Sequence, residues 1–117
     1  MSTPFPVVIF HNPECGTSRN ALALIEAAGH KPQVIDYLKA GWTRGQLLAL
    51  FAAANLSVRQ ALRESEAGAY PHLTDADDET LLAAMISHPI LVQRPFVATP
   101  RGIKLCRPKA EVVRGLL

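Results

Sequence analysis

Cys15 lies in a stretch that makes it the leading candidate nucleophile of the chain. Residues 11–20 read His-Asn-Pro-Glu-Cys-Gly-Thr-Ser-Arg-Asn, and they follow the apolar run Val7–Phe10. An amphipathic segment comes next, so the pattern predicts a cysteine at the point where a strand turns into a helix. The free N–H groups and the dipole of a helix N-terminus stabilise a thiolate there. We therefore expect Cys15 to be an accessible, reactive thiol rather than a small buried side chain.

Cys15 and Ser18 form a C-x-x-S motif, which is a C-x-x-C redox motif with its second thiol replaced by a hydroxyl. A single thiol cannot close a local disulfide. A covalent intermediate on Cys15 must then be resolved by glutathione, by the thiol of a partner or by Cys106. A chain of 117 residues can bury a core without a disulfide, so we expect both cysteines to be reduced thiols with different roles.

Arginines at predicted element boundaries are candidates for holding an oxyanion beside this thiol. A phosphatase-type loop needs an arginine at the position that Ala21 occupies, so the positive charge must come from elsewhere in the chain. Arg94 and Arg107 each precede a proline, which favours extended backbone at the residue before it. Arg63 lies at a third boundary, and planar guanidinium groups suit tetrahedral oxyanions. For each arginine taken singly, a solvated surface charge is the alternative.

The histidines suggest a role near the thiol but no metal site. His11 directly precedes the cysteine turn, where an imidazolium would lower the thiol pKa and a neutral ring would hydrogen-bond the loop backbone. His30, His72 and His88 lack metal-ligand spacing to one another or to a cysteine, so we expect no metal. The sequence has no glycine-rich nucleotide loop, so we expect no bound cofactor either.

Composition and charge place the chain among ordinary soluble domains. Of its 117 residues, 49% are hydrophobic, which is enough for one core, and we expect a single domain over residues 1–117. The net charge of +2 comes from scattered basic residues, so we expect no nucleic-acid partner. No apolar run could span a bilayer and no secretion signal is present, so we expect a cytoplasmic monomer that binds no membrane.

Hydrophobic periodicity predicts an α/β domain for the two ends of the chain. The runs Val7–Phe10 and Pro32–Leu38 have strand composition, and a helix capped by Ser18 and stopped by Gly29 separates them. Such a strand–helix–strand unit pairs its strands in parallel. Residues 95–106 return to β character as a hairpin around a Pro-Arg-Gly turn.

The middle of the chain, roughly residues 43–88, has helical texture and is predicted to be an insertion. Thr43 is placed to cap one helix, and the segment Ser57–Arg63 is predicted to begin another. The acidic residues of 74–79 precede a third apolar helical run, as the helix dipole prefers. A last helix over Glu111–Leu117 is expected to close the domain.

Together these motifs resemble those of the glutaredoxin-coupled arsenate reductase family, in order and across nearly the whole chain. The resemblance implies a thioredoxin- or glutaredoxin-like fold, in which helices flank a small mixed sheet and a helical insertion interrupts the chain. It rests on residues 11–20, Ser57-Val58-Arg59, His88-Pro89-Ile90-Leu91, Arg94-Pro95 and Leu105-Cys106-Arg107-Pro108.

The resemblance also implies a mechanism. Cys15 would attack arsenate, glutathione would act as co-substrate in reduction to arsenite, and the partner glutaredoxin would remove the glutathione. His11 and Ser18 would support the nucleophile, Cys106 would be structural or secondary, and Pro95 looks like the cis-proline that thioredoxin-like folds hold beside the active thiol. Binding of the oxyanion would fall to three arginines, Arg63, Arg94 and Arg107.

Two other functions are compatible with the same fold. A monothiol glutaredoxin-like reductase acting on glutathionylated proteins would use Cys15 and tolerate loss of the three arginines. A redox-type transcriptional regulator that docks on RNA polymerase is the second, but such regulators often carry a C-x-x-C switch, which Ser18 breaks. We therefore favour arsenate reduction.

Overall fold

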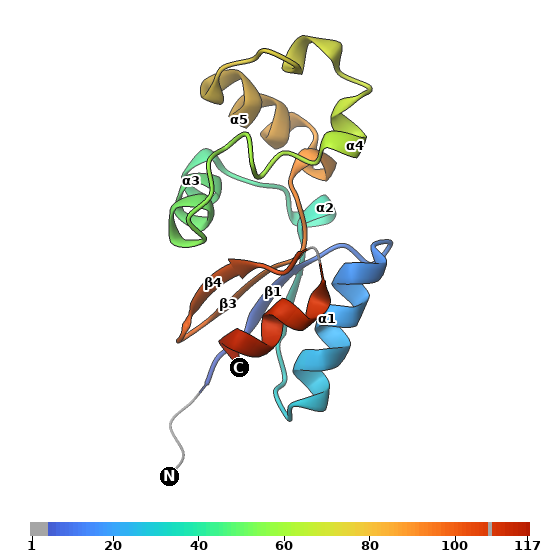
Figure 1. Ribbon diagram of the computed structural model, residues 1–117, viewed down its shortest axis with the longest axis vertical. Coiled ribbons are helices and arrows are strands. Elements are labelled where there is room, and N and C mark those ends of the chain that lie inside the picture. Colours follow the sequence, from blue (N-terminus) through green and yellow to red (C-terminus); the bar gives the residue numbers. More distant parts are fainter. Residues whose placement is uncertain (1–4, 108) are drawn as a thin grey trace. The chain divides into compact units, whose positions relative to one another are not determined.

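The computed structural model describes residues 5–107 and 109–117, and the chain divides into two compact units (Figure 1). The first unit, Met1–Tyr37 with Arg94–Leu117, joins the two ends of the chain, and we call it the thiol unit. The second, Leu38–Gln93, is continuous in sequence, and we call it the helical unit. The single domain over residues 1–117 stays a prediction.

The thiol unit is built on a four-stranded mixed sheet with the strand order β2-β1-β3-β4. β1 (Val8–His11) pairs in parallel with β2 (Gln33–Asp36) and antiparallel with β3 (Phe96–Thr99). β3 also pairs antiparallel with β4 (Gly102–Leu105) as a hairpin. The predicted mixed sheet, parallel crossover and hairpin are all confirmed.

Two helical segments pack against each other and against this sheet. They are α1 (Gly16–Ala27) and the 3₁₀ helix η3 (Ala110–Leu116), coloured blue and red in Figure 1. The predicted last helix therefore exists, but it takes the tighter 3₁₀ form that short terminal segments adopt. Apolar side chains of the strands and of both helical segments form one core: Val7, Ile9, Ala21, Ile25, Val97, Cys106, Ala110, Val113 and Leu116.

Helix α1 begins earlier than the sequence predicts. Its N-cap is Cys15 rather than Ser18, because a turn closed by the Cys15 N–H on the Asn12 carbonyl oxygen (3.0 Å) starts the helix directly after Cys15. Ser18 is buried in the first turn of the helix. Gly29 ends the helical stretch as predicted, with a φ of +90° that favours glycine.

The helical unit contains short helices joined by turns. Thr43 caps its first long helix as predicted, since its Oγ1 accepts a hydrogen bond from the Gln46 N–H at 3.1 Å. Asp77 caps the second through the Thr80 N–H at 2.9 Å. α2 (Tyr37–Ala40) begins at the boundary of the units, and α3 (Arg44–Ala53), α4 (Glu64–Ala67), η1 (Pro71–Leu73), α5 (Asp78–Ser87) and η2 (Pro89–Leu91) follow.

The helix predicted to begin in the segment Ser57–Arg63 is absent from the structure, and the prediction was wrong. The segment forms turns and then a bridge from Leu62 to Val92. The Arg63 N–H donates to the Leu91 carbonyl at 2.7 Å, and the Gln93 N–H donates to the Ala61 carbonyl at 2.8 Å. These groups bond to the returning chain, and they are therefore not available to extend a helix.

No helix in the described ranges is long and apolar enough to cross a membrane.

Candidate functional site

Cys15 occupies the N-cap of α1, with extended backbone angles (φ −96°, ψ 121°). The amide N–H groups of Thr17 and Ser18, in the first turn of the helix, face the side of the cap where the sulfur lies. The cysteine is 8% exposed, so the expectation of an openly accessible thiol was wrong. The guanidinium groups of Arg94 and Arg107, which are distant in sequence, lie close to its sulfur, and local pattern does not reveal such contacts.

The pKa of the Cys15 thiol is lowered despite its burial. Desolvation is the largest single influence and raises the pKa, because it penalises the charged form. The Ser18 amide, the Arg94 guanidinium and the Thr17 amide each lower it, and together they outweigh the burial. The site therefore favours a thiolate more than water does.

Arg94 brings a buried positive charge to the sulfur. Its side chain lies beside Cys15, and the residue is only 5% exposed. The peptide bond from Arg94 to Pro95 is cis. The cis-proline that the resemblance implies is confirmed. The Nε and Nη1 groups of Arg94 are buried and have no hydrogen-bond partner among the residues that the structure describes. A buried cation with unused donors is costly unless an anion binds to it, so Arg94 is suited to hold an oxyanion next to the thiolate.

Arg107 approaches the same sulfur from the end of β4. Its Nη1 lies 4.0 Å from Cys15 Sγ and donates a hydrogen bond to the Arg94 carbonyl oxygen at 3.1 Å. The neighbouring Cys106 N–H donates to the Pro95 carbonyl at 2.9 Å. These bonds fix the segment after β4 against the segment before β3, so the fold brings Arg94 and Arg107 together although they are far apart in sequence.

His11 and Ser18 form a buried pair behind the cysteine turn, with His11 Nδ1 2.6 Å from Ser18 Oγ. Burial lowers the pKa of His11; Asp36 opposes this effect, and Arg19 adds to it. The ring is therefore neutral at pH 7, which disfavours the imidazolium role. A neutral His11 was expected to hydrogen-bond the loop backbone. The structure instead pairs the ring with the Ser18 hydroxyl.

Asn12 was not singled out from the sequence, yet it is 1% exposed and directs several hydrogen bonds in the cysteine turn. Its Oδ1 accepts from the Glu14 N–H at 2.9 Å, and its own N–H donates to Ser18 Oγ at 3.1 Å. The signal that could have found it is the Asn-Pro pair, because asparagine is favoured at the first position of a turn and proline at the second.

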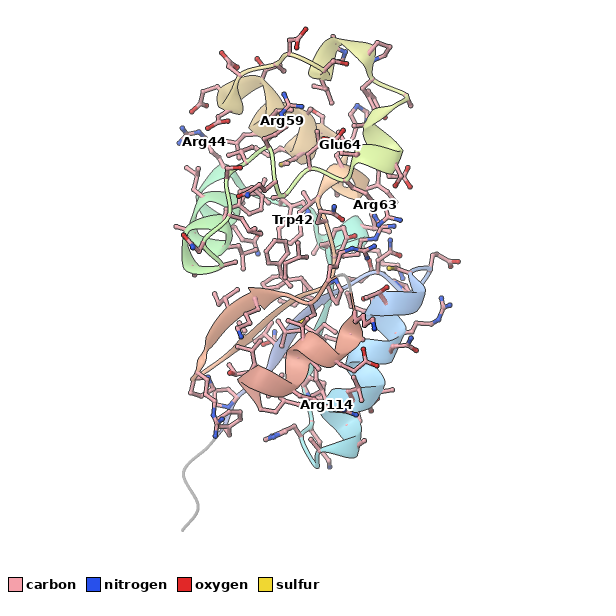
Figure 2. The ribbon with its side chains drawn as sticks, viewed as in Figure 1. Trp42, Arg44, Arg59, Arg63, Glu64 and Arg114 are labelled. Atoms are coloured by element: carbon pink, nitrogen blue, oxygen red, sulfur yellow. The ribbon has the colours of Figure 1, made fainter. Side chains whose placement is uncertain are left out.

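Arg63 belongs to the helical unit, where it is the N-cap of α4 and half-buried (Figure 2). Its Nε lies 3.8 Å from Glu66 Oε1, on the same short helix. The place of Arg63 in the oxyanion-binding trio stays a prediction.

Cys106 is a free thiol with an environment unlike that of Cys15. It is fully buried in the core of the thiol unit, and desolvation raises its pKa to about 12 against the opposing charge of Lys104. Its sulfur lies 3.9 Å from the Lys104 carbonyl oxygen. A buried thiol with so high a pKa is a poor nucleophile, so Cys106 is suited to packing rather than to resolving an intermediate.

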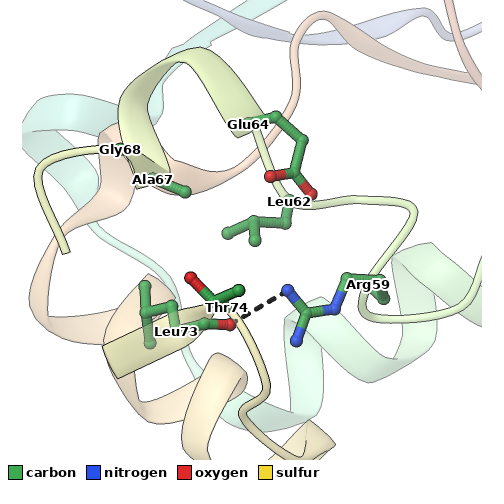
Figure 3. A pocket seen from close by; sticks show the side chains of 7 residues that line it. All are labelled: Arg59, Leu62, Glu64, Ala67, Gly68, Leu73 and Thr74. Atoms are coloured by element: carbon green, nitrogen blue, oxygen red, sulfur yellow. Dashed lines mark hydrogen bonds between the residues drawn. The ribbon is translucent and has the colours of Figure 1, made fainter. Parts of the chain in front are cut away.

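The helical unit has a cavity of its own, of about 290 Å³, lined by residues that include Arg59, Glu64 and Thr74 (Figure 3). The Arg59 guanidinium donates to the carbonyl oxygens of Leu73 at 3.0 Å and Ala76 at 2.9 Å. These bonds tie Arg59 to the end of η1 and to the loop before α5, so its guanidinium has a structural role. Across the part of the chain that the structure describes, no three His, Cys, Asp or Glu side chains gather as metal ligands would.

Comparison with known proteins gives consistent matches along the chain. The ArsC family matches residues 10–114. Arsenate reductase ArsI2 of Synechocystis sp. is 57% identical over 114 residues, which is 95% of this chain and 81% of that protein. An arsenate reductase of Escherichia coli is 46% identical over 115 residues, covering 95% and 80% of the two chains.

Solved structures agree with the sequence matches. The arsenate reductase from Vibrio cholerae superposes with a TM-score of 0.86 at 36% identity, covering 98% of this chain and 100% of that one. This similarity confirms the predicted thioredoxin-like α/β fold.

Proposed function

Because this chain belongs to the ArsC family, we propose that it is an arsenate reductase with the Cys15 thiolate as its nucleophile. The observation that carries the proposal is the arrangement in the thiol unit. A thiol whose pKa is lowered lies at a helix N-terminus beside a buried arginine with unused hydrogen-bond donors. The names of the similar proteins, arsenate reductases from several bacteria, support the same activity.

Arsenate binding is proposed to use the free donors of Arg94 together with the guanidinium of Arg107. A tetrahedral oxyanion next to the sulfur would satisfy the buried Nε and Nη1 of Arg94 and balance its charge. Arg63 of the helical unit is the third proposed ligand, on the basis of the family resemblance. These donors also hold the charge that develops on the oxygens as sulfur bonds to arsenic.

In the first chemical step, the Cys15 sulfur forms a bond to arsenic, and one arsenate oxygen leaves as water after protonation. Arsenic remains As(V) in this adduct. Glutathione then attacks through its thiol and displaces a second oxygen, again as water. The Cys15 and glutathione sulfurs then bond to each other as both As–S bonds break, which leaves one electron pair on arsenic. The resulting As(III) takes up one water and leaves as arsenite.

Glutaredoxin is proposed to remove the glutathione by thiol–disulfide exchange and to restore the Cys15 thiol. An external thiol is needed because Ser18 replaces the second cysteine of a redox motif and Cys106 is buried with a raised pKa. The scheme uses no bound cofactor. The proposed dependence on glutathione is compatible with activity in the reducing cytoplasm, and a monomer stays our prediction.

The proposal is tested by arsenate-dependent NADPH oxidation in an assay coupled through glutathione, glutaredoxin and glutathione reductase. We expect turnover with the wild type and with Cys106→Ala. We also expect a mixed disulfide between Cys15 and glutathione, seen by mass spectrometry when glutaredoxin is omitted. Reduction of glutathionylated proteins without arsenate turnover would instead identify a monothiol glutaredoxin-like reductase. Recovery of RNA polymerase subunits by an enzymatically silent protein would identify a regulator.

A further inference from the structure

Asn12 is one of the few polar residues buried in the thiol unit, and it is not one of the residues that the reaction scheme uses. We propose that Asn12 is the positioning residue that holds the Cys15 sulfur at the N-terminus of α1. This inference rests on the proposed function, in which Cys15 is the nucleophile, and it adds the device that keeps the nucleophile in place.

The hydrogen bonds of Asn12 reach both ends of the cysteine turn. On the near side, Asn12 Oδ1 accepts from the Glu14 N–H at 2.9 Å, and the Asn12 carbonyl accepts from the Cys15 N–H at 3.0 Å. On the far side, the Asn12 N–H donates to Ser18 Oγ at 3.1 Å. One residue therefore binds the residue before the cysteine, the cysteine itself and a residue in the first turn of α1.

This arrangement fixes the sulfur relative to the helix amides. Ser18 supplies one of the N–H groups that stabilise the thiolate, and its side chain is held by Asn12 and by His11. The backbone bonds of Asn12 would form with most residues at this position. The side-chain bond to Glu14 would not, because it needs an acceptor on a short side chain. Loss of that acceptor would free the turn and let the sulfur move away from the amides.

The charged groups that face the sulfur come from other segments. Arg94 precedes β3, and Arg107 follows β4. His11 Nδ1 pairs with Ser18 Oγ, and Arg19 Nη1 donates to the Pro13 carbonyl at 2.8 Å. An Asn12→Ala change alters none of these charges. A shift of the thiol pKa in that variant therefore reports the geometry of the helix N-terminus.

The test is the pH titration of the Cys15 thiol, followed by thiolate ultraviolet absorbance and by the rate of alkylation with iodoacetamide. For Asn12→Ala we expect the pKa to rise by about one unit and alkylation near neutral pH to slow about tenfold. Asn12→Ser, which keeps an acceptor, should restore most of the rate. Asn20→Ala, at an exposed position on α1, is the matched control and should titrate like the wild type.

An unchanged thiol pKa in a folded Asn12→Ala variant would overturn the proposal. A second measurement on the unsubstituted protein decides the matter even if that variant does not fold: the Glu14 amide should exchange slowly with solvent although Glu14 is exposed. Exchange at the rate of a free amide would overturn the proposal too. Neither readout uses arsenate, so failure here leaves the proposed function standing, and failure of arsenate turnover leaves the role of Asn12 standing.

Discussion

The N-terminus of α1 and the end of β4 each hold a cysteine, and the two sites treat the same side chain in opposite ways. Cys15 is 8% exposed and Cys106 is fully buried, so both lie largely out of water. Yet the pKa of Cys15 is lowered, whereas that of Cys106 is raised to about 12. The difference lies in the hydrogen-bond donors around each sulfur, because helix amides and Arg94 face Cys15 and apolar side chains surround Cys106. Burial alone therefore does not decide whether a thiol is reactive.

The largest expected effect is the difference in chemical reactivity between the two cysteines. In the folded protein near neutral pH, iodoacetamide should modify Cys15 at least about a thousandfold faster than Cys106, since thiolate content and access both favour Cys15. Peptide mass spectrometry over time measures both rates in one sample, and unfolding in urea should make the rates converge. Equal rates in the folded protein would erase the distinction between the two sites.

The second prediction separates the two arginines at the Cys15 sulfur. Arg94→Ala should raise the Cys15 pKa and lower kcat/KM for arsenate by about a hundredfold or more, because it removes both the neighbouring charge and the unused donors. Arg107→Ala should raise the thiol pKa less, since its Nη1 is engaged by the Arg94 carbonyl. Arg101→Ala, on the exposed turn of the hairpin, is the control.

Titration of each variant, together with its steady-state kinetics, measures these effects. A larger pKa shift in Arg107→Ala than in Arg94→Ala would contradict the assignment of Arg94 as the main positive charge at the sulfur. Arg94→Lys sharpens the result, because it keeps a positive charge but loses the planar donors, so it should preserve the thiol pKa better than arsenate turnover.

The third prediction concerns stability at alkaline pH. Because folding raises the pKa of Cys106 from 9.0 to about 12, the folded state holds a proton that the unfolded state releases in that window. The contribution of Cys106 is fully present below pH 9.0 and is lost as pH rises toward about 12. The loss is about 1.4 kcal/mol per pH unit within the window.

Urea denaturation at about pH 8 and about pH 10 measures this loss as a change in the free energy of unfolding. The wild type should lose more stability between the two conditions than Cys106→Ala does. Cys15→Ala should lose more stability than the wild type between the two conditions. Folding lowers the pKa of Cys15, so this thiol stabilises the wild-type fold increasingly as the pH rises toward 9.0, and the variant lacks that gain. The same pH dependence in all three proteins would show that the folded-state pKa values of the two thiols do not differ as described.

The smallest expected effect is that of Ser18→Ala. The variant keeps the Ser18 amide, which acts on the thiolate, but removes the hydroxyl that accepts from the Asn12 N–H and pairs with His11. We expect a rise of the Cys15 pKa by about half a unit, seen as roughly threefold slower alkylation near neutral pH. Thr17→Ala is a useful comparison, because it leaves the buried pair of His11 and Ser18 intact. A fall in the pKa of Ser18→Ala would contradict the stabilising role of this pair.

Local signals in the sequence were sufficient for much of the fold. The strand composition of Val7–Phe10, the glycine stop at Gly29 and the cap at Thr43 each depend on residues close in sequence, and the structure contains all three features. The parallel crossover followed from the short connection between the strands, and the family resemblance supplied the cis-proline at Pro95. These features need no knowledge of distant contacts.

The errors occur where distant hydrogen bonds outweigh local preference. The segment Ser57–Arg63 has helical composition, but its backbone groups bond to the chain that returns around Leu91 to Gln93. Ser18 has the chemistry of a cap, but its hydroxyl pairs with His11, and the cap is Cys15. The contacts of Arg94 and Arg107 with Cys15 depend in the same way on groups that only the fold brings together. Asn12 is different, because its bonds are local and the Asn-Pro pair is a signal for them.

The donors at the N-terminus of α1 and at Arg94 lower the pKa of the Cys15 thiol although the residue is only 8% exposed. The most direct test is the pH titration of the Cys15 thiol in the wild-type protein, in the absence and presence of arsenate's unreactive analogue phosphate. We expect a pKa below the ordinary cysteine value of 9.0, and Arg94→Ala should raise it toward that value. A Cys15 thiol that titrates at or above 9.0, with no response to Arg94→Ala, would contradict it.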